Sequence, residues 1–162
     1  MKRYYLAYGS NLNMGQMSYR CPGAIAVGVA FLKGYQLLFK GSKTGAFLTI
    51  EPSKKGLVPV GVWLVNEEHE RSLDIYEGYP DFYYKKDVEV QMVTIETCEV
   101  INIKAFVYIM DESRNIGIPT NGYVQVCLNG YRDFGFDEGH LIKAITHSQR
   151  LKDRSEYNGT GK

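Results

Sequence analysis

The order of apolar and polar residues predicts that the chain opens with a short strand and a short helix. An apolar run from Arg3 to Tyr8 leads into Gly9-Ser10-Asn11, and a helical pattern follows from Leu12 to Arg20. Cys21-Pro22-Gly23 ends this pattern, because proline cannot continue a helix. Glycine allows the backbone to turn sharply, and Ser10 or Asn11 can cap the helix. We therefore predict a strand, a tight turn and a helix start.

The next part of the chain has the composition of short antiparallel strands. Strands are expected at Ala24–Phe31, Tyr35–Lys40, Ala46–Ile50 and Leu57–Val65. The turns between them, at Lys33–Gly34, Gly41–Gly45 and Pro52–Gly56, are too short for helical crossovers. A curled sheet or small barrel is therefore more economical than a Rossmann arrangement.

The second half alternates between helical and strand patterns. Asn66 can cap a helix that Gly78 and Pro80 end, and two long strands are expected from Tyr83 to about Ile95 and from Val100 to Met110. Helices are then expected at Thr120–Asp133 and Asp137–Leu151. These elements predict one α+β domain over residues 1–151, followed by a polar, flexible tail over residues 152–162.

Length, charge and cysteine content narrow the class of protein. The 162 residues suit a single domain, and 19 basic against 18 acidic residues leave no overall field for nucleic acid or an anionic membrane. Three cysteines without a C-x-x-C pair argue against a disulfide framework or a zinc site. His69, His140 and His147 form no i, i+4 ligand pair and are expected to be solvated. No segment reaches membrane-spanning length, so we expect a soluble, cytoplasmic protein.

The Gly9-Ser10-Asn11 turn has the features of an anion site. The first amides of a helix lack partners within the helix, and the positive end of the helix dipole favours a carboxylate or phosphate at that point. The same residue types also form ordinary capped turns. The turn alone leaves both interpretations open.

Glu77 is placed to have a raised pKa. It falls in the last turn of the helix predicted after Asn66, beside the apolar Leu73 and Tyr76. A carboxylate at that position meets the negative end of the helix dipole and loses water on burial, and both effects raise its pKa. It could then accept a proton near neutral pH. Without further information, a surface glutamate at a helix end is the alternative.

Several segments together resemble the γ-glutamylcyclotransferase-like family. They are Tyr8-Gly9-Ser10-Asn11-Leu12, Leu73-Asp74-Ile75-Tyr76-Glu77-Gly78-Tyr79-Pro80, Tyr83 shortly after, and Pro119-x-x-x-Tyr123 followed by Gly130. The resemblance extends from about Tyr4 to Leu151. It implies a small mixed, mainly antiparallel β-barrel with peripheral helices. It also implies an enzyme without cofactor or metal that releases 5-oxoproline from γ-glutamyl compounds, by attack of the α-amine on the γ-carbonyl.

The resemblance also assigns roles to individual residues. Glu77 matches the family's catalytic glutamate and would carry a proton from the α-amine to the leaving amine. The amides of Gly9, Ser10 and Asn11 would hold the substrate's α-carboxylate, within a ligand loop that also contains Tyr8 and Leu12. Tyr8, Tyr83 and Tyr123 would line the pocket. Tyr84 competes with Tyr83 for that position, since the two are adjacent in a strand.

Three functional hypotheses follow from these assignments. The first is a γ-glutamyl cyclotransferase acting on a γ-glutamyl amino acid, peptide or amine. The second keeps the cyclisation but takes a γ-glutamyl group on a lysine side chain or on a biosynthetic intermediate. The third is a non-catalytic binding module on the same barrel. In each case the expected partner is a small molecule rather than nucleic acid or membrane, and a monomer and a homodimer both remain open.

Overall fold

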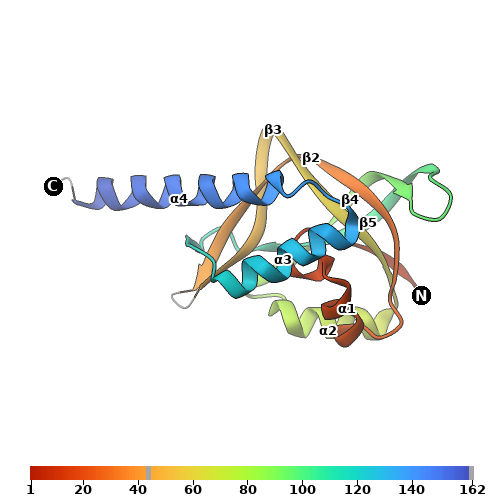
Figure 1. Cartoon of the computed structure of the whole chain (residues 1–162). Coiled ribbons are helices and arrows are strands. Elements are labelled where there is room, and N and C mark those ends of the chain that lie inside the picture. The colour runs from red at the N-terminus through yellow and green to blue at the C-terminus, as the bar shows by residue number, and fades with distance from the viewer. Residues whose placement is uncertain (43–44, 161–162) are drawn as a thin grey trace.

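The backbone forms a mixed β-barrel with helices on its outside. The computed structural model describes residues 1–42 and 45–160 (Figure 1). In chain order the elements are β1 (Arg3–Ala7), the 3₁₀ turn η1 (Ser10–Leu12), α1 (Met14–Arg20), β2 (Ile25–Ser42), β3 (Gly45–Val65), α2 (Glu67–Glu77), β4 (Tyr83–Thr94), β5 (Val100–Met110), β6 (Asn115–Ile116), α3 (Asn121–Phe134) and α4 (Gly139–Thr160). This arrangement confirms the predicted α+β class.

The barrel closes because β3 pairs with strands on both of its sides. Within the described residues the order is β3-β1-β5-β4-β2, and a further pairing of β2 with β3 completes a ring of five strands. The pairing of β1 with β5 is parallel, whereas the other pairings in the ring are antiparallel. The short β6 adds to the edge of β2. The mixed, mainly antiparallel barrel is thus confirmed.

Two long strands stand where four short ones were predicted. β2 and β3 pair from Ser42 opposite Gly45 to Ile25 opposite Leu64. The turn predicted at Lys33–Gly34 is wrong, since the register shifts there by a bulge, in which Gly34 has a φ of +84°. The turn predicted at Pro52–Gly56 does not end a strand, since those residues lie within β3, although Ser53–Gly56 have no partner in β2. A bulge increases the local twist of a strand, which lets a long hairpin wrap around a barrel. Residues 43 and 44 of the predicted Gly41–Gly45 turn lie outside the described residues.

The predicted ends of the helices that follow β3 are largely confirmed. The Asn66 side chain accepts from the amide of His69, and Gly78 ends α2 in the left-handed conformation. His69 was expected to be solvated, and this was wrong. It is buried, and its Nδ1 accepts from the amide of Asn66 at 3.1 Å, completing a capping box. Thr120 caps α3.

Helix α4 runs further than predicted. It was expected to end near Leu151, but it continues to Thr160 and extends away from the barrel (Figure 1). Its first half packs on β2, where the buried Ser148 hydroxyl accepts from the amide of Phe39 at 2.9 Å. The flexibility expected of residues 152–162 stays a prediction.

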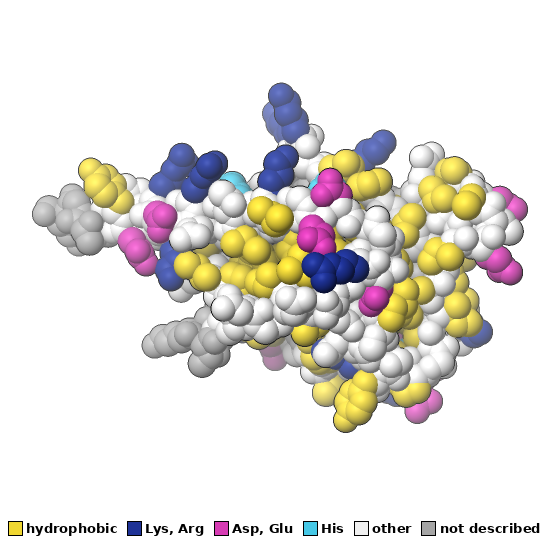
Figure 2. Space-filling view, in the orientation of Figure 1, with side chains coloured by type: hydrophobic (Ala, Val, Ile, Leu, Met, Phe, Trp, Pro, Cys, Tyr) yellow, Lys and Arg dark blue, Asp and Glu magenta, His cyan; other side chains and the backbone are white. Residues whose placement is uncertain are grey.

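Charges of both signs are interspersed on the face of the molecule drawn in Figure 2. In residues 1–42 and 45–160 no helix is long and apolar enough to cross a membrane. The same residues contain no group of three or more His, Cys, Asp or Glu side chains arranged to hold a metal ion. Cys127 is buried on α3.

Candidate active site

A cavity of about 420 Å³ lies between the segment after β1, the end of α2 and the beginning of β3. Its lining residues are Tyr5, Tyr8, Gly9, Ser10, Asn11, Phe47, Leu48, Ile75, Tyr76, Glu77, Gly78, Phe82, Tyr83, Tyr108 and Tyr123. The structure therefore brings together seven of the eight predicted site residues. Six of the fifteen lining residues are tyrosines, so the cavity is aromatic with hydroxyl groups at its edges.

The loop after β1 is built differently from the prediction. Ser10–Leu12 form a separate 3₁₀ turn, and α1 begins only at Met14. The cap of α1 is Asn13, whose side chain accepts from the amide of Gln16, so the prediction that Ser10 or Asn11 caps that helix is wrong. The first hydrogen bond of η1 runs from the amide of Leu12 to the carbonyl of Gly9. The amides of Ser10 and Asn11 therefore have no acceptor within their own turn.

Leu12, the one predicted site residue that does not line the cavity, packs in the core next to this loop. It is fully buried and is not among the residues that line the cavity. Its side chain lies within 2.8 Å of the positions that a Cβ would take on Gly61 and Gly130. Leu12 thus packs into the core beneath the loop rather than facing a ligand in the cavity.

Asn11 joins the loop to Glu77. Its side-chain Nδ2 donates to the Tyr5 hydroxyl at 2.9 Å and to Glu77 Oε1 at 3.3 Å. Its Oδ1 accepts from Arg20, and its backbone carbonyl accepts from Trp63 Nε1 at 2.9 Å. An amide side chain offers two donors and an acceptor, and all are used here. Asn11 is therefore held in one orientation, with a donor directed at the glutamate.

Burial raises the pKa of Glu77 to about 7, and the nearby positive charge of Arg20 opposes this shift. The upward shift of the Glu77 pKa agrees with the prediction, but the residues around the carboxylate differ from those expected. Tyr76, expected to lie beside the carboxylate, and Tyr79, two residues beyond it in the chain, are 45% and 41% exposed. The enclosing groups come instead from the other tyrosines of the lining. Burial raises the pKa of the Tyr5 and Tyr8 hydroxyls, and the charge of Glu77 raises it further. Glu77 is half-buried, and tertiary packing, rather than the helix itself, limits the access of water to its carboxylate.

Arg20 is a site residue that the sequence interpretation missed. Its guanidinium lies 3.5 Å from the centroid of the Tyr76 ring and donates to Asn11 Oδ1 and Gln16 Oε1. The Tyr76 hydroxyl is in turn 3.2 Å from Ser10 Oγ. No motif marks this arginine, because it meets Glu77 only through the folding of α1 against α2. It supplies the positive charge nearest to the carboxylate.

The tyrosine hydroxyls mainly fix the backbone around the cavity. Tyr8 donates to the carbonyl of Tyr108 at 2.6 Å, and Tyr83 donates to the carbonyl of Leu48 at 2.8 Å. Tyr123 accepts from the amide of Leu48 at 3.0 Å. Tyr83 lines the cavity, whereas the Tyr84 hydroxyl donates to Glu112 outside it, which resolves the choice between the two. Any contact of these hydroxyls with substrate stays a prediction.

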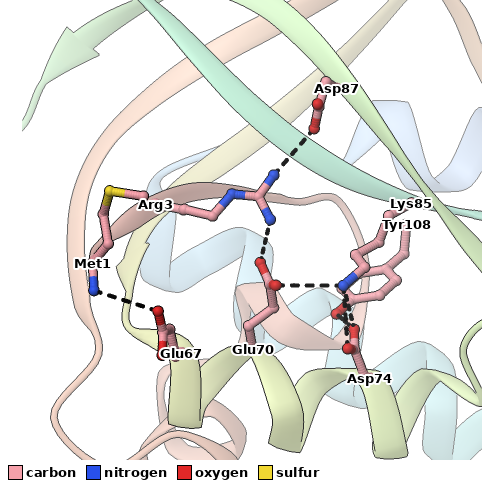
Figure 3. Close-up of polar contacts among 8 residues, drawn as sticks. All are labelled: Met1, Arg3, Glu67, Glu70, Asp74, Lys85, Asp87 and Tyr108. Atoms are coloured by element: carbon pink, nitrogen blue, oxygen red, sulfur yellow. Dashed lines mark hydrogen bonds and ion pairs between the residues drawn. The ribbon is translucent and has the colours of Figure 1, made fainter.

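A set of ion pairs fixes α2 against the barrel (Figure 3). Asp74 Oδ1 accepts from the Tyr108 hydroxyl at 2.6 Å and lies 3.0 Å from Lys85 Nζ. Glu70 pairs with Arg3 at 2.5 Å and with Lys85 at 3.4 Å. Asp74 precedes Glu77 by three residues, so these contacts also set the position of the glutamate. Tyr108 connects the two regions, since its ring lines the cavity.

Close packing of α3 on the loop depends on Gly130. A Cβ there would lie 2.7 Å from the amide nitrogen of Asn13 and 2.7 Å from Leu12 Cβ. We expect Gly130→Ala to destabilise the fold by about 1–3 kcal/mol, as overpacking does. Thermal unfolding measures this, at roughly 2–4 °C for each kcal/mol. Gly122→Ala on the same helix is the matched control, because nothing lies within 4 Å of its Cβ position. Equal melting temperatures for the two variants would contradict the packing argument.

Comparison with known proteins agrees with this architecture. The family model described as "Gamma-glutamyl cyclotransferase, AIG2-like" matches residues 5–125. A γ-glutamylcyclotransferase of Bos taurus is 33% identical over 138 residues, covering 81% of this chain and 71% of the relative. A solved structure titled "Gamma-glutamyl cyclotransferase" superposes with a TM-score of 0.72 at 26% identity, covering 94% of this chain and 87% of that one. An uncharacterized protein from Homo sapiens gives 0.70 at 27% identity, covering 93% and 86%.

The barrel and its glutamate-containing cavity thus place the protein in the γ-glutamylcyclotransferase-like fold class. The family match spans three quarters of the chain and includes the loop after β1, Glu77, Tyr83 and Tyr123. The chain belongs to the γ-glutamyl cyclotransferase, AIG2-like family.

Proposed function

We propose that this protein is a γ-glutamyl cyclotransferase that releases 5-oxoproline from a γ-glutamyl compound. The observation that carries the proposal is the position of Glu77. A carboxyl group with a pKa of about 7 lies in a tyrosine-lined cavity and accepts a hydrogen bond from Asn11 of the adjoining loop. A group with that pKa can both accept and return a proton near neutral pH. The names of the Bos taurus relative and of the solved structure agree with this chemistry.

In the proposed complex the glutamyl part of the substrate lies beside Glu77 and the loop after β1. Its α-carboxylate accepts hydrogen bonds from the amides of Gly9, Ser10 and Asn11. Because α1 starts later in the chain than predicted, the physical reason for assigning the α-carboxylate to these amides changes. The loop residues do not belong to α1, which begins at Met14, so we assign the attraction to the backbone amides of the 3₁₀ turn. Such donors bind an anion without a basic side chain.

The proposed reaction needs one group that carries a proton between two nitrogens. Glu77 takes a proton from the substrate's α-ammonium, and the free amine attacks the γ-carbonyl carbon. The C–N bond to the leaving amine then breaks, and Glu77 returns the proton to that nitrogen. As the lactam forms, the attacking nitrogen loses a second proton, which the ionised Glu77 accepts and passes to the same leaving amine. The products are therefore 5-oxoproline and the amine as its ammonium ion, and atoms and charges balance. Asn11 holds the carboxylate in place during these transfers.

A panel of γ-glutamyl compounds tests the proposed function. We expect mass spectrometry to detect 5-oxoproline from at least one γ-glutamyl amino acid, peptide or amine. Release only from ε-(γ-glutamyl)lysine would favour the second hypothesis, which the sequence left open. Binding of several compounds without any release would show that the protein is a binding module and overturn the proposal.

Chelation should leave the activity in place. The proposed reaction uses an internal nucleophile and a carboxylate, and it needs no Lewis acid or redox step. We expect 5-oxoproline release to be unchanged after treatment with EDTA and dialysis. Loss of activity that one divalent ion restores would mean that the site chemistry has been misassigned.

The pH dependence should report the titration of Glu77. Only the ionised carboxylate can accept the proton, so kcat/KM should decline about tenfold per pH unit below a pKa near 7. Arg20 lowers that pKa, and its removal therefore moves it upward. We expect the acid limb of Arg20→Met to lie at higher pH than that of the wild type. Arg71→Met, which removes an exposed cation from α2, should leave the limb in place. An unshifted limb in Arg20→Met would contradict the assignment of that limb to Glu77.

A further inference from the structure

Part of the cavity lining is apolar or aromatic and exposed. Ile75, Tyr76 and Phe47 are exposed lining residues, at 83%, 45% and 38%. Phe82 lies beside Phe47, with ring centroids 6.4 Å apart in an edge-to-face arrangement. If the glutamyl part binds at the loop amides and Glu77, as the proposed function requires, Phe47 and Phe82 offer the leaving group an aromatic surface in the same cavity.

Arg114 lies beside this aromatic surface. Its guanidinium carbon lies 4.2 Å from the centroid of the Phe82 ring. Within residues 1–42 and 45–160, no carboxylate lies within 4.0 Å of this guanidinium. The other arginine of the site, Arg20, differs in this respect, because it donates to two side-chain oxygens. Stacking on a ring leaves the edge of a guanidinium free to donate.

The turn that carries Arg114 is fixed to the strand that carries Phe82. The amide of Asp111 donates to the carbonyl of Phe82 at 3.0 Å, and the amide of Arg114 donates to the carbonyl of Asp111 at 3.1 Å. Asp111 Oδ1 accepts from the amide and hydroxyl of Ser113. These bonds, together with the charge of Arg114, hold the pKa of Asp111 below its usual range. Arg114 is itself partly buried. A cation held in this way is preorganised for an incoming anion.

We propose that Arg114 determines specificity for the leaving group. Its guanidinium pairs with a carboxylate on the leaving group, and the apolar part of that group packs against Phe47 and Phe82. The preferred substrates are then γ-glutamyl derivatives of apolar amino acids with a free α-carboxylate. A γ-glutamyl group on a lysine side chain places its carboxylate several bonds further away and would fit less well. The inference deepens the proposed function and rests on it.

The test compares three substrates with the wild-type protein and its variants. The substrates are γ-glutamylphenylalanine, the analogue in which the carboxylate of the phenylalanine is a carboxamide, and ε-(γ-glutamyl)lysine. The readout is kcat and KM for 5-oxoproline release. Arg114→Met keeps an apolar stem on Phe82 and removes the charge, while Arg114→Lys keeps the charge. Lys104→Met removes an exposed cation from β5 and is the matched control for net charge.

We expect wild-type kcat/KM to be at least about tenfold higher for γ-glutamylphenylalanine than for its carboxamide, as for the loss of a charge-assisted hydrogen bond. In Arg114→Met this ratio should fall towards one, mainly through KM, because the contact is made in the ground state as well. Arg114→Lys should restore part of the ratio, and Lys104→Met should leave it unchanged.

The outcomes separate this inference from the proposed function. If no compound of the panel yields 5-oxoproline, the proposed function fails and this inference fails with it. If 5-oxoproline forms equally well from acid and carboxamide, or fastest from ε-(γ-glutamyl)lysine, only the role of Arg114 is overturned. The acid-to-carboxamide ratio of the wild type needs no variant, so the test holds even if Arg114→Met does not fold.

Discussion

Replacing Glu77 with glutamine should lower kcat by roughly 10²- to 10⁴-fold, the loss typical of removing a general base. Glutamine keeps the shape of the side chain and can still bond to Asn11, but it cannot accept a proton. Substrate binding should change less than turnover, since the loop that holds the α-carboxylate is untouched. Steady-state release of 5-oxoproline measures both quantities.

The size of this effect follows from the raised pKa. With ordinary values of about 4.3 for glutamate and about 7.7 for an α-amine, the proton transfer costs roughly 4.6 kcal/mol. With Glu77 at about 7, the same transfer to the carboxylate costs only about 1 kcal/mol. The half-buried position of Glu77 therefore removes most of the cost of forming the nucleophilic amine. A solvent-exposed carboxylate in its place could not do this.

Protein stability provides a control for Glu77→Gln. The pKa of Glu77 is higher in the folded protein than in the unfolded chain, so the stability associated with its protonated form is lost as the pH rises through about 7. Glutamine has no such penalty. We therefore expect the variant to melt at a higher temperature than the wild type at pH 8 and at a similar temperature below the ordinary pKa of glutamate. A variant that is more stable and yet inactive has lost chemistry rather than fold.

A Glu77→Gln protein with near-normal kcat on a confirmed γ-glutamyl substrate would refute the proposed mechanism. Attention would then move to the other acids of α2, namely Glu67, Glu68 and Asp74. Of these, Asp74 is already engaged by Tyr108 and Lys85, and Glu67 is exposed near the N-terminus. Glu68→Gln is the matched control, because Glu68 lies exposed on the same helix.

Replacing Gly9 with valine should raise KM by about tenfold or more, the effect of losing one good charged hydrogen bond or the space for it. A Cβ on Gly9 would lie 3.2 Å from the Tyr123 hydroxyl and 3.5 Å from Leu48, both in the cavity wall. The valine methyl groups would extend further into the space assigned to the substrate's α-carboxylate. Substrate binding, measured through KM and by calorimetry with the Glu77→Gln protein, is the quantity to follow.

The effect on KM should increase with the size of the side chain placed at Gly9. Gly9→Ala adds only the Cβ, and a shift of a few tenths of an ångström in its neighbours can accommodate it, so its effect on KM should be smaller than that of Gly9→Val. Gly122→Val, at an open position on α3, controls for valine in place of glycine. If Gly9→Val has the KM and kcat of the wild type, the assignment of the loop to the α-carboxylate is wrong.

The sequence alone determined those parts of the protein that depend on neighbouring residues. Asn66 and Gly78 delimit α2, because a cap and a left-handed glycine act within one turn of the chain, and this places Glu77 at the helix end. The short strand followed by a turn at Gly9 was predicted for the same reason. The order of apolar segments and the short connections predicted a curled sheet or small barrel. The family resemblance implied that the barrel is mixed and closed.

Only the tertiary structure decided where long strands pass through turn-like sequences. Gly34 and the segment from Pro52 to Gly56 resemble turns locally, and the ladder between β2 and β3 is interrupted there. Gly34 and Ser53–Gly56 have no partner, but pairing resumes on both sides, so the two strands continue along the barrel. The start of α1 shows the same limit, since η1 forms where Trp63 and α3 pack against the loop.

The environment of Glu77 could not be predicted from its neighbours in the chain. Tyr76 and Tyr79 are close to it in sequence and are largely exposed, whereas Tyr5, Asn11 and Arg20 are more than fifty residues away and surround it. A pKa depends on burial and on charges in three dimensions, and those are set when α1, α2 and the barrel strands come together. The sequence could therefore identify the glutamate, but only the assembled barrel makes it a group that titrates near neutral pH.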